Sequence, residues 1–139
     1  MVTREEFIRC LQIDWDAYLA SFDAMPEIEK AAFLARQGYP TFAALLAHLT
    51  AWWRVGMQVI RHHQSDPEYH HPQMDVDAFN QAVIDRVSGL SETVVIAEFK
   101  AARQELLDFV NNLSDADLAN PKINLQLLIE VIEHLEEHQ

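Results

Sequence analysis

Two histidines near the end of the chain, His134 and His138, have the spacing with which a helix offers two ligands to one metal ion. Side chains four residues apart on a helix lie one above the other, so both imidazoles can reach one point in space. Apolar residues share that face, namely Leu128, Val131 and Leu135. We therefore expect a last helix, from about Asn124 to the end, whose histidine pair faces a core.

His48 is the third candidate ligand, because it is the one other histidine in a strongly apolar helical segment. It precedes Trp52 by four residues, which places it at the edge of the buried face. Three imidazoles from two facing helices suit a divalent ion (Zn, Ni, Fe, Co, Cu or Mn) and leave a coordination position open. Such an ion makes a nucleophile at neutral pH, by lowering the pKa of a bound water to about 7 or by binding a thiol as its thiolate.

Glu130 precedes His134 by four residues, so its carboxylate is placed either to orient that imidazole through its second nitrogen or to carry a proton. A structural explanation competes with the metal site. Imidazolium interacts well with the negative end of a helix dipole, and a single histidine in an apolar helix is often a hydrogen-bonded core residue. Spacing alone leaves both interpretations open.

The composition favours one helical domain spanning residues 1–139. Half of the residues are hydrophobic, whereas Gly (3) and Pro (5) are scarce. No apolar run reaches the roughly 20 residues of a membrane span, the N-terminus lacks a signal pattern, and a single cysteine excludes an internal disulfide. These features predict a cytoplasmic protein without a membrane partner. A net charge of −12, from 22 acidic and 10 basic residues, argues against nucleic acid as a partner.

Helical periodicity predicts four long amphipathic segments and no strand, hence an all-α four-helix bundle. The first segment starts at Thr3, which has capping-box spacing to Glu6, and ends before Pro26. Thr41 and Ser91 are the expected caps of the second and third segments. The candidate ligands therefore belong to the second and fourth helices.

The connections between these segments differ in character. Residues 26–40 are expected to hold one helical turn, and residues 61–72 form a polar loop whose four histidines are expected to be solvated. The segment from Asp75 to Val87 predicts a short extra helix in a crossover connection. Cys10 lies beside the apolar stripe of the first helix and is expected to be a packed residue rather than a nucleophile.

Several segments resemble the DinB/YfiT-like family of bacterial four-helix bundles. Residues 42–52 are similar to its second helix, where a Leu-x-His-Leu-x-x-Trp pattern supplies the first metal ligand, and residues 130–138 resemble its closing His-x3-His. Residues 76–80, 99–107 and 113–118 resemble the ClbS/DfsB-type subgroup in particular. The resemblance covers nearly the whole chain.

The resemblance implies a divalent metal ion held by His48, His134 and His138, with Trp52 as a wall of the pocket, in a protein that forms a homodimer. It also implies a metal-dependent transferase or hydrolase that acts on a small electrophile, in a protective reaction, with a low-molecular-weight thiol as a further cofactor. Two alternatives remain beside this prediction. One is a non-catalytic protein that binds a small apolar molecule, and the other is a dimeric module that only packs helices.

Overall fold

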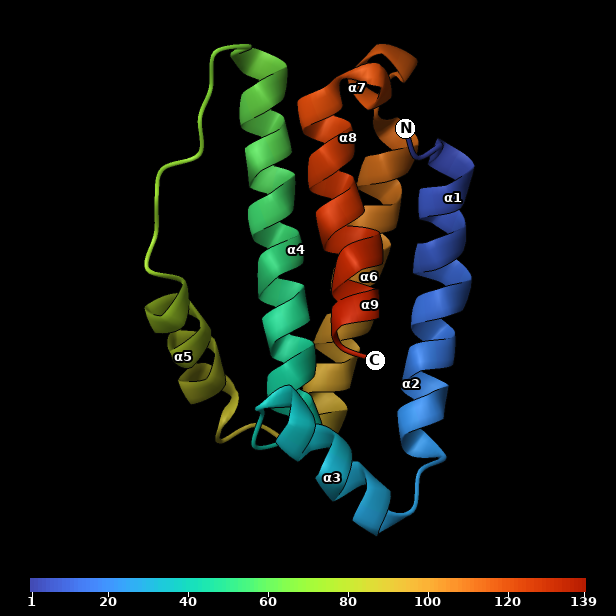
Figure 1. Cartoon of the computed structure of the whole chain (residues 1–139), viewed down its shortest axis with the longest axis vertical. Coiled ribbons are helices and arrows are strands. Elements are labelled where there is room, and N and C mark those ends of the chain that lie inside the picture. Colours follow the sequence, from blue (N-terminus) through green and yellow to red (C-terminus); the bar gives the residue numbers. More distant parts are fainter.

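The computed structural model describes residues 1–139, and its four long helical rods lie side by side (Figure 1). In chain order the rods are α1 (Arg4–Arg9), continued by the π-helical η1 (Cys10–Asp14) and α2 (Trp15–Asp23); α4 (Phe42–Ser65); α6 (Glu92–Asn112); and α8 (Pro121–Leu127), continued by the π-helical η2 (Leu128–Glu133) and α9 (His134–Glu137). The connections contain α3 (Glu27–Gln37), α5 (Val76–Val87) and α7 (Asp115–Ala119). The predicted all-α bundle is confirmed.

Side-chain caps explain where the first three rods begin. Thr3 and Glu6 form the predicted capping box, in which each side chain accepts a hydrogen bond from the other residue's backbone N–H. Thr41 accepts from the backbone N–H of Ala44, and Ser91 accepts from that of Val94. The predicted helix starts at these positions are therefore confirmed.

A single cluster of 31 buried residues joins the four rods. Its centre is aromatic: the ring of Trp15 lies edge-on to that of Trp53, with centroids 5.1 Å apart, and the ring of Phe99 lies 5.0 Å from Trp53. All three side chains are fully buried. None of the helices combines the length and the apolar character that a membrane span requires.

Two connections are more helical than predicted. Residues 26–40 contain α3, a helix of 11 residues rather than one turn, because Phe33 packs against Phe22 with ring centroids 5.8 Å apart. Gly38, with φ of 80°, ends that helix in the left-handed region. The second helix continues through His62 to Ser65, where a polar loop was predicted.

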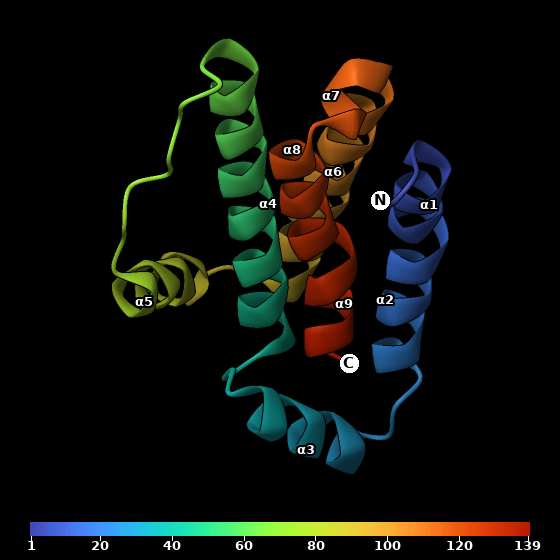
Figure 2. The ribbon, with the colours of Figure 1, turned by 45° about the horizontal axis from the view of Figure 1, so that its top comes forward.

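The positions of α3 and α5 matter for the site. Figure 2 shows α3 crossing the end of the bundle near the C-terminus, whereas α5 lies outside α4. The last rod begins at Pro121, three residues earlier than predicted, because Asn120 caps it and proline suits the first helical position. The bundle thus carries one helix below the C-terminal turn and one beside α4.

Candidate metal centre

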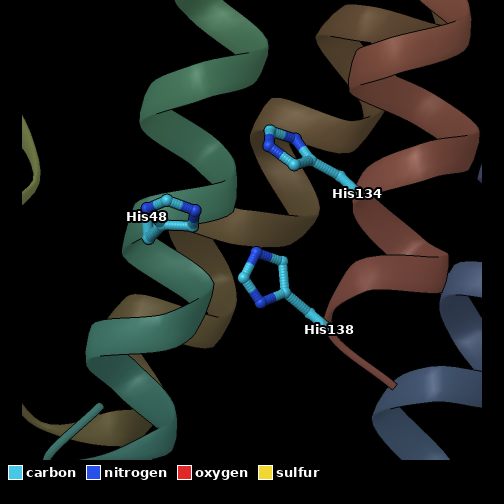
Figure 3. Close-up of side chains that lie close together, drawn as sticks. All are labelled: His48, His134 and His138. Atoms are coloured by element: carbon cyan, nitrogen blue, oxygen red, sulfur yellow. The ribbon is translucent and has the colours of Figure 1, made fainter. Parts of the chain in front are cut away.

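The structure brings His48, His134 and His138 together (Figure 3). Each offers one ring nitrogen, and these three atoms lie within 4.8 Å of one another. The ring centroid of His48 is 5.1 Å from that of His138 and 5.8 Å from that of His134. Figure 3 shows one nitrogen of each ring directed toward the space between the rings. The α4 helix and the last helix thus supply a convergent set of nitrogen donors.

The tautomer of His138 is set by Gln37, at the end of α3. The Oε1 atom of Gln37 lies 2.9 Å from Nδ1 of His138, while its Nε2 donates to the backbone carbonyl of Gln139. Because an amide oxygen only accepts, Nδ1 of His138 must carry the proton, which leaves a lone pair on Nε2. That Nε2 is buried and has no partner within the chain. Tyr18 holds the same turn, since its hydroxyl donates to the carbonyl of His138.

Glu130 lies behind His134. Its Oε2 is 3.3 Å from Nδ1 of His134, and its Oε1 accepts a hydrogen bond from Gln126. The Glu130 side chain is only 5% exposed and that of His134 only 12%. The two atoms lie within ion-pair distance but do not form a hydrogen bond. A carboxylate at this position electrostatically favours a proton on Nδ1 of His134, which would leave the other ring nitrogen free as a ligand. This position suits the orienting function that the sequence suggested for Glu130.

Gly56 creates the space that Glu130 occupies. A Cβ atom added at Gly56 would lie 2.6 Å from Cγ of Glu130 and 3.1 Å from its Cδ. The backbone of α4 therefore approaches the Glu130 side chain more closely than any residue other than glycine at position 56 would allow. The close packing of these two residues links α4 to the orientation of His134.

We expect Gly56→Ala to push the Glu130 carboxylate away from His134. The variant should bind a divalent metal about tenfold more weakly, the scale found when the partner of a ligand is lost, and should be less stable by about 1–3 kcal/mol. Competition with a chromophoric chelator and urea unfolding measure the two effects. Gly89→Ala is the matched control, since a Cβ there meets nothing within 4 Å. Equal metal affinity and equal stability of the two variants would contradict the inference that Gly56 controls the position of the Glu130 carboxylate.

His48 is held as a neutral imidazole. Burial, together with the nearby His138 and His134, lowers its pKa to about 4, although hydrogen bonding to Asn80 acts in the opposite direction. Asn80 also accepts a hydrogen bond of 2.8 Å from the indole of Trp52. The pKa of His138 is lowered as well, chiefly by burial. At neutral pH both rings are therefore unprotonated and available as ligands.

Aromatic rings flank the three histidines. Trp52, the predicted pocket wall, is half-buried, and its ring centroid lies 6.4 Å from His48 and 4.8 Å from Phe79. Tyr39 lies 5.2 Å from His48 and 6.1 Å from His138, and burial raises the pKa of its phenol to about 12. These rings give the histidines an apolar border that carries no charge at neutral pH.

The π-helical η2 sets the direction of the two histidines that follow it. A π turn contains one residue more than an α turn, so it rotates every later residue by about 100° around the axis. Two buried indoles hold this turn: Nε1 of Trp53 donates to the carbonyl of Glu130 at 2.9 Å, and Nε1 of Trp15 donates to that of Val131 at 3.0 Å. The aromatic core thereby positions the ligands.

Cys10 also contacts η2, with its Sγ 3.4 Å from the carbonyl of Val131. The thiol is buried, and this burial, with Asp14 nearby, raises its pKa to about 12. Such a thiol stays protonated at neutral pH and is a poor nucleophile. These findings agree with the prediction that Cys10 is a packed residue.

Three residues of the site were not predicted from the sequence: Gln37, Asn80 and Tyr39. Gln37 lies on α3, which was expected to be mostly irregular, and Asn80 lies on the extra helix α5. No spacing rule connects either residue to a histidine far away in the chain. The only signal was indirect, since buried imidazoles require oxygen partners from some neighbouring element.

Comparison with known proteins identifies the family to which the chain belongs. A family model described as the DinB superfamily matches residues 11–139, a range that contains all three histidines and Glu130. Comparisons with curated proteins and with solved structures gave no significant match. The ClbS/DfsB-type subgroup is not distinguished by this match and stays a prediction. The helical bundle and the match over most of its length show that the chain belongs to the DinB superfamily.

Proposed function

We propose that this protein is a metal-dependent enzyme, with one divalent ion held by His48, His134 and His138, that joins water or a small thiol to a small electrophile. The observation that carries the proposal is the convergence of three imidazole nitrogens within 4.8 Å at the edge of an apolar core. The reaction is a hydrolysis if water attacks and a transfer if a thiol attacks. The thiol-dependent transfer and the protective purpose rest on family resemblance.

The donor set fits a divalent ion on two grounds. Nε2 of His138 and Nδ1 of His48 are buried without a hydrogen-bond partner, although buried polar atoms are normally paired. Three neutral nitrogens also match the preference of borderline ions such as Zn and Ni. A purely structural use of the histidines would leave these atoms unpaired at a cost in stability.

When bound, such an ion supplies Lewis-acid chemistry, which lowers the pKa of water or of a thiol. The residues of the chain provide the surroundings. Gln37 fixes the proton of His138 on Nδ1, and Glu130 orients His134. Trp52 and Tyr39 border the histidines with aromatic faces, which exclude water from one side and offer contact area to an apolar substrate.

The test is turnover of a panel of epoxides, alkyl halides and activated alkenes, each with and without a low-molecular-weight thiol. We expect protein loaded with a divalent ion to convert at least one compound, chelation to abolish the reaction, and added ion to restore it. His70→Ala, at an exposed position outside the site, should retain full activity. Turnover that survives chelation would reject the proposal.

A further inference from the structure

A cavity of about 450 Å³ lies between α4, α5 and the segment that joins them. In Figures 1 and 2 this segment leaves the end of α4 and runs outside it to α5. The segment contributes Tyr69 and His71 to the cavity, and α5 contributes Phe79 and Arg86. The cavity includes none of the three histidines of the metal centre.

The charge of this cavity is opposite to that of the chain. Acidic residues outnumber basic ones by 22 to 10, yet no carboxylate lines the cavity. Its lining includes Arg54 from α4 and Arg86 from α5, together with His62 and His71. Two guanidinium groups from opposite walls favour an anion over a cation or a neutral molecule.

Both guanidinium groups are available to a ligand. Arg54 lies 3.8 Å from a carboxylate oxygen of Glu105, and Arg86 lies 3.5 Å from one of Glu98. Both arginine side chains are about half exposed, at 52% and 51%, and exposed ion pairs of this kind contribute little to stability. A ligand carboxylate that accepts hydrogen bonds from two parallel N–H groups therefore competes well with these glutamates for either guanidinium.

The remaining lining suits an apolar body. Ala51, Val55, Val59 and Phe79 supply apolar surface. Such a surface gains free energy when it covers the apolar part of a ligand.

An aromatic wall completes the cavity on the side of the joining segment. The ring of Tyr69 lies 4.5 Å from that of His62, and its hydroxyl is 3.1 Å from Nδ1 of His71. Flat rings of this kind pack well against another aromatic ring. We propose that the cavity binds a small organic anion that combines a carboxylate with an aromatic body.

Calorimetric titration of the protein with 2-naphthoate and with 2-naphthamide tests this proposal, because the two probes share their rings and differ in charge. We expect saturable binding of 2-naphthoate and at least tenfold weaker binding of 2-naphthamide. His134→Ala should bind 2-naphthoate as the wild type does. That result would show that 2-naphthoate binds in the cavity and not, through its carboxylate, at a metal ion. The test of the cavity is then independent of the proposed enzyme activity.

Variants then locate the site. Arg54→Gln and Arg86→Gln should each weaken 2-naphthoate binding about tenfold, since each removes a charge-assisted hydrogen bond. Arg61→Gln is the control, because Arg61 lies on α4 over the ring of Phe109 and does not line the cavity. The proposal is overturned if no saturation occurs at millimolar 2-naphthoate, if 2-naphthamide binds equally well, or if Arg61→Gln weakens binding as much as the other two variants.

Discussion

Replacement of His134 by alanine is expected to weaken the binding of a divalent metal ion more than a hundredfold, whereas His70→Ala leaves it unchanged. Even the outer partners of metal ligands contribute 10–100-fold to affinity, so the loss of a direct ligand should exceed that range. The affinity is measured by competition with a chromophoric chelator for each of several divalent ions.

His134→Ala also removes the partner of the buried Glu130 carboxylate, so reduced stability could by itself weaken binding. His138→Ala is therefore measured in parallel, because its second nitrogen contacts only the amide of Gln37. Both variants should lose the metal while keeping the far-ultraviolet circular dichroism of the bundle. Wild-type metal affinity in either folded variant would show that the histidines have a structural function and do not bind the ion.

Trp53→Phe should lower the free energy of unfolding by about 3 kcal/mol and weaken metal binding about tenfold. The change removes the donor to the Glu130 carbonyl in η2 and leaves a small cavity in the aromatic core. Because η2 sets the direction of His134 and His138, a less rigid η2 should hold the two imidazoles less precisely in the positions that bind the metal ion. Urea unfolding and chelator competition give the two values.

Phe99→Leu provides the comparison for Trp53→Phe. Phe99 is fully buried beside Trp53 but donates no hydrogen bond to η2. We expect it to lose stability through packing alone and to keep the metal affinity of the wild type. Unchanged metal affinity in Trp53→Phe, or equal losses in both variants, would show that η2 does not position the ligands.

The bundle was predictable because its signals are local. Apolar side chains recur at helical spacing, and Thr3, Thr41 and Ser91 mark helix starts through short-range hydrogen bonds. The convergence of the three histidines was also predictable, because two lie one turn apart and the third lies in a strongly apolar helix. Local spacing and burial were sufficient for these features.

Other features depend on contacts between distant segments, which no local pattern contains. The α3 helix buries a single side chain, that of Phe33, and is stabilised by the contact of Phe33 with Phe22. The π turn in η2 is held by indole groups from two other rods, 77 and 116 residues away in the chain from the carbonyls that they bind. For the same reason Gln37 and Asn80 became visible only in the structure.

The most direct test of the metal centre is elemental analysis together with X-ray absorption spectroscopy of wild-type protein loaded with a single divalent ion. We predict about one ion per chain in a nitrogen and oxygen environment, with the multiple scattering that imidazole ligands produce. A spectrum without imidazole scattering, a sulfur neighbour from Cys10, or protein that binds no divalent ion would contradict this prediction.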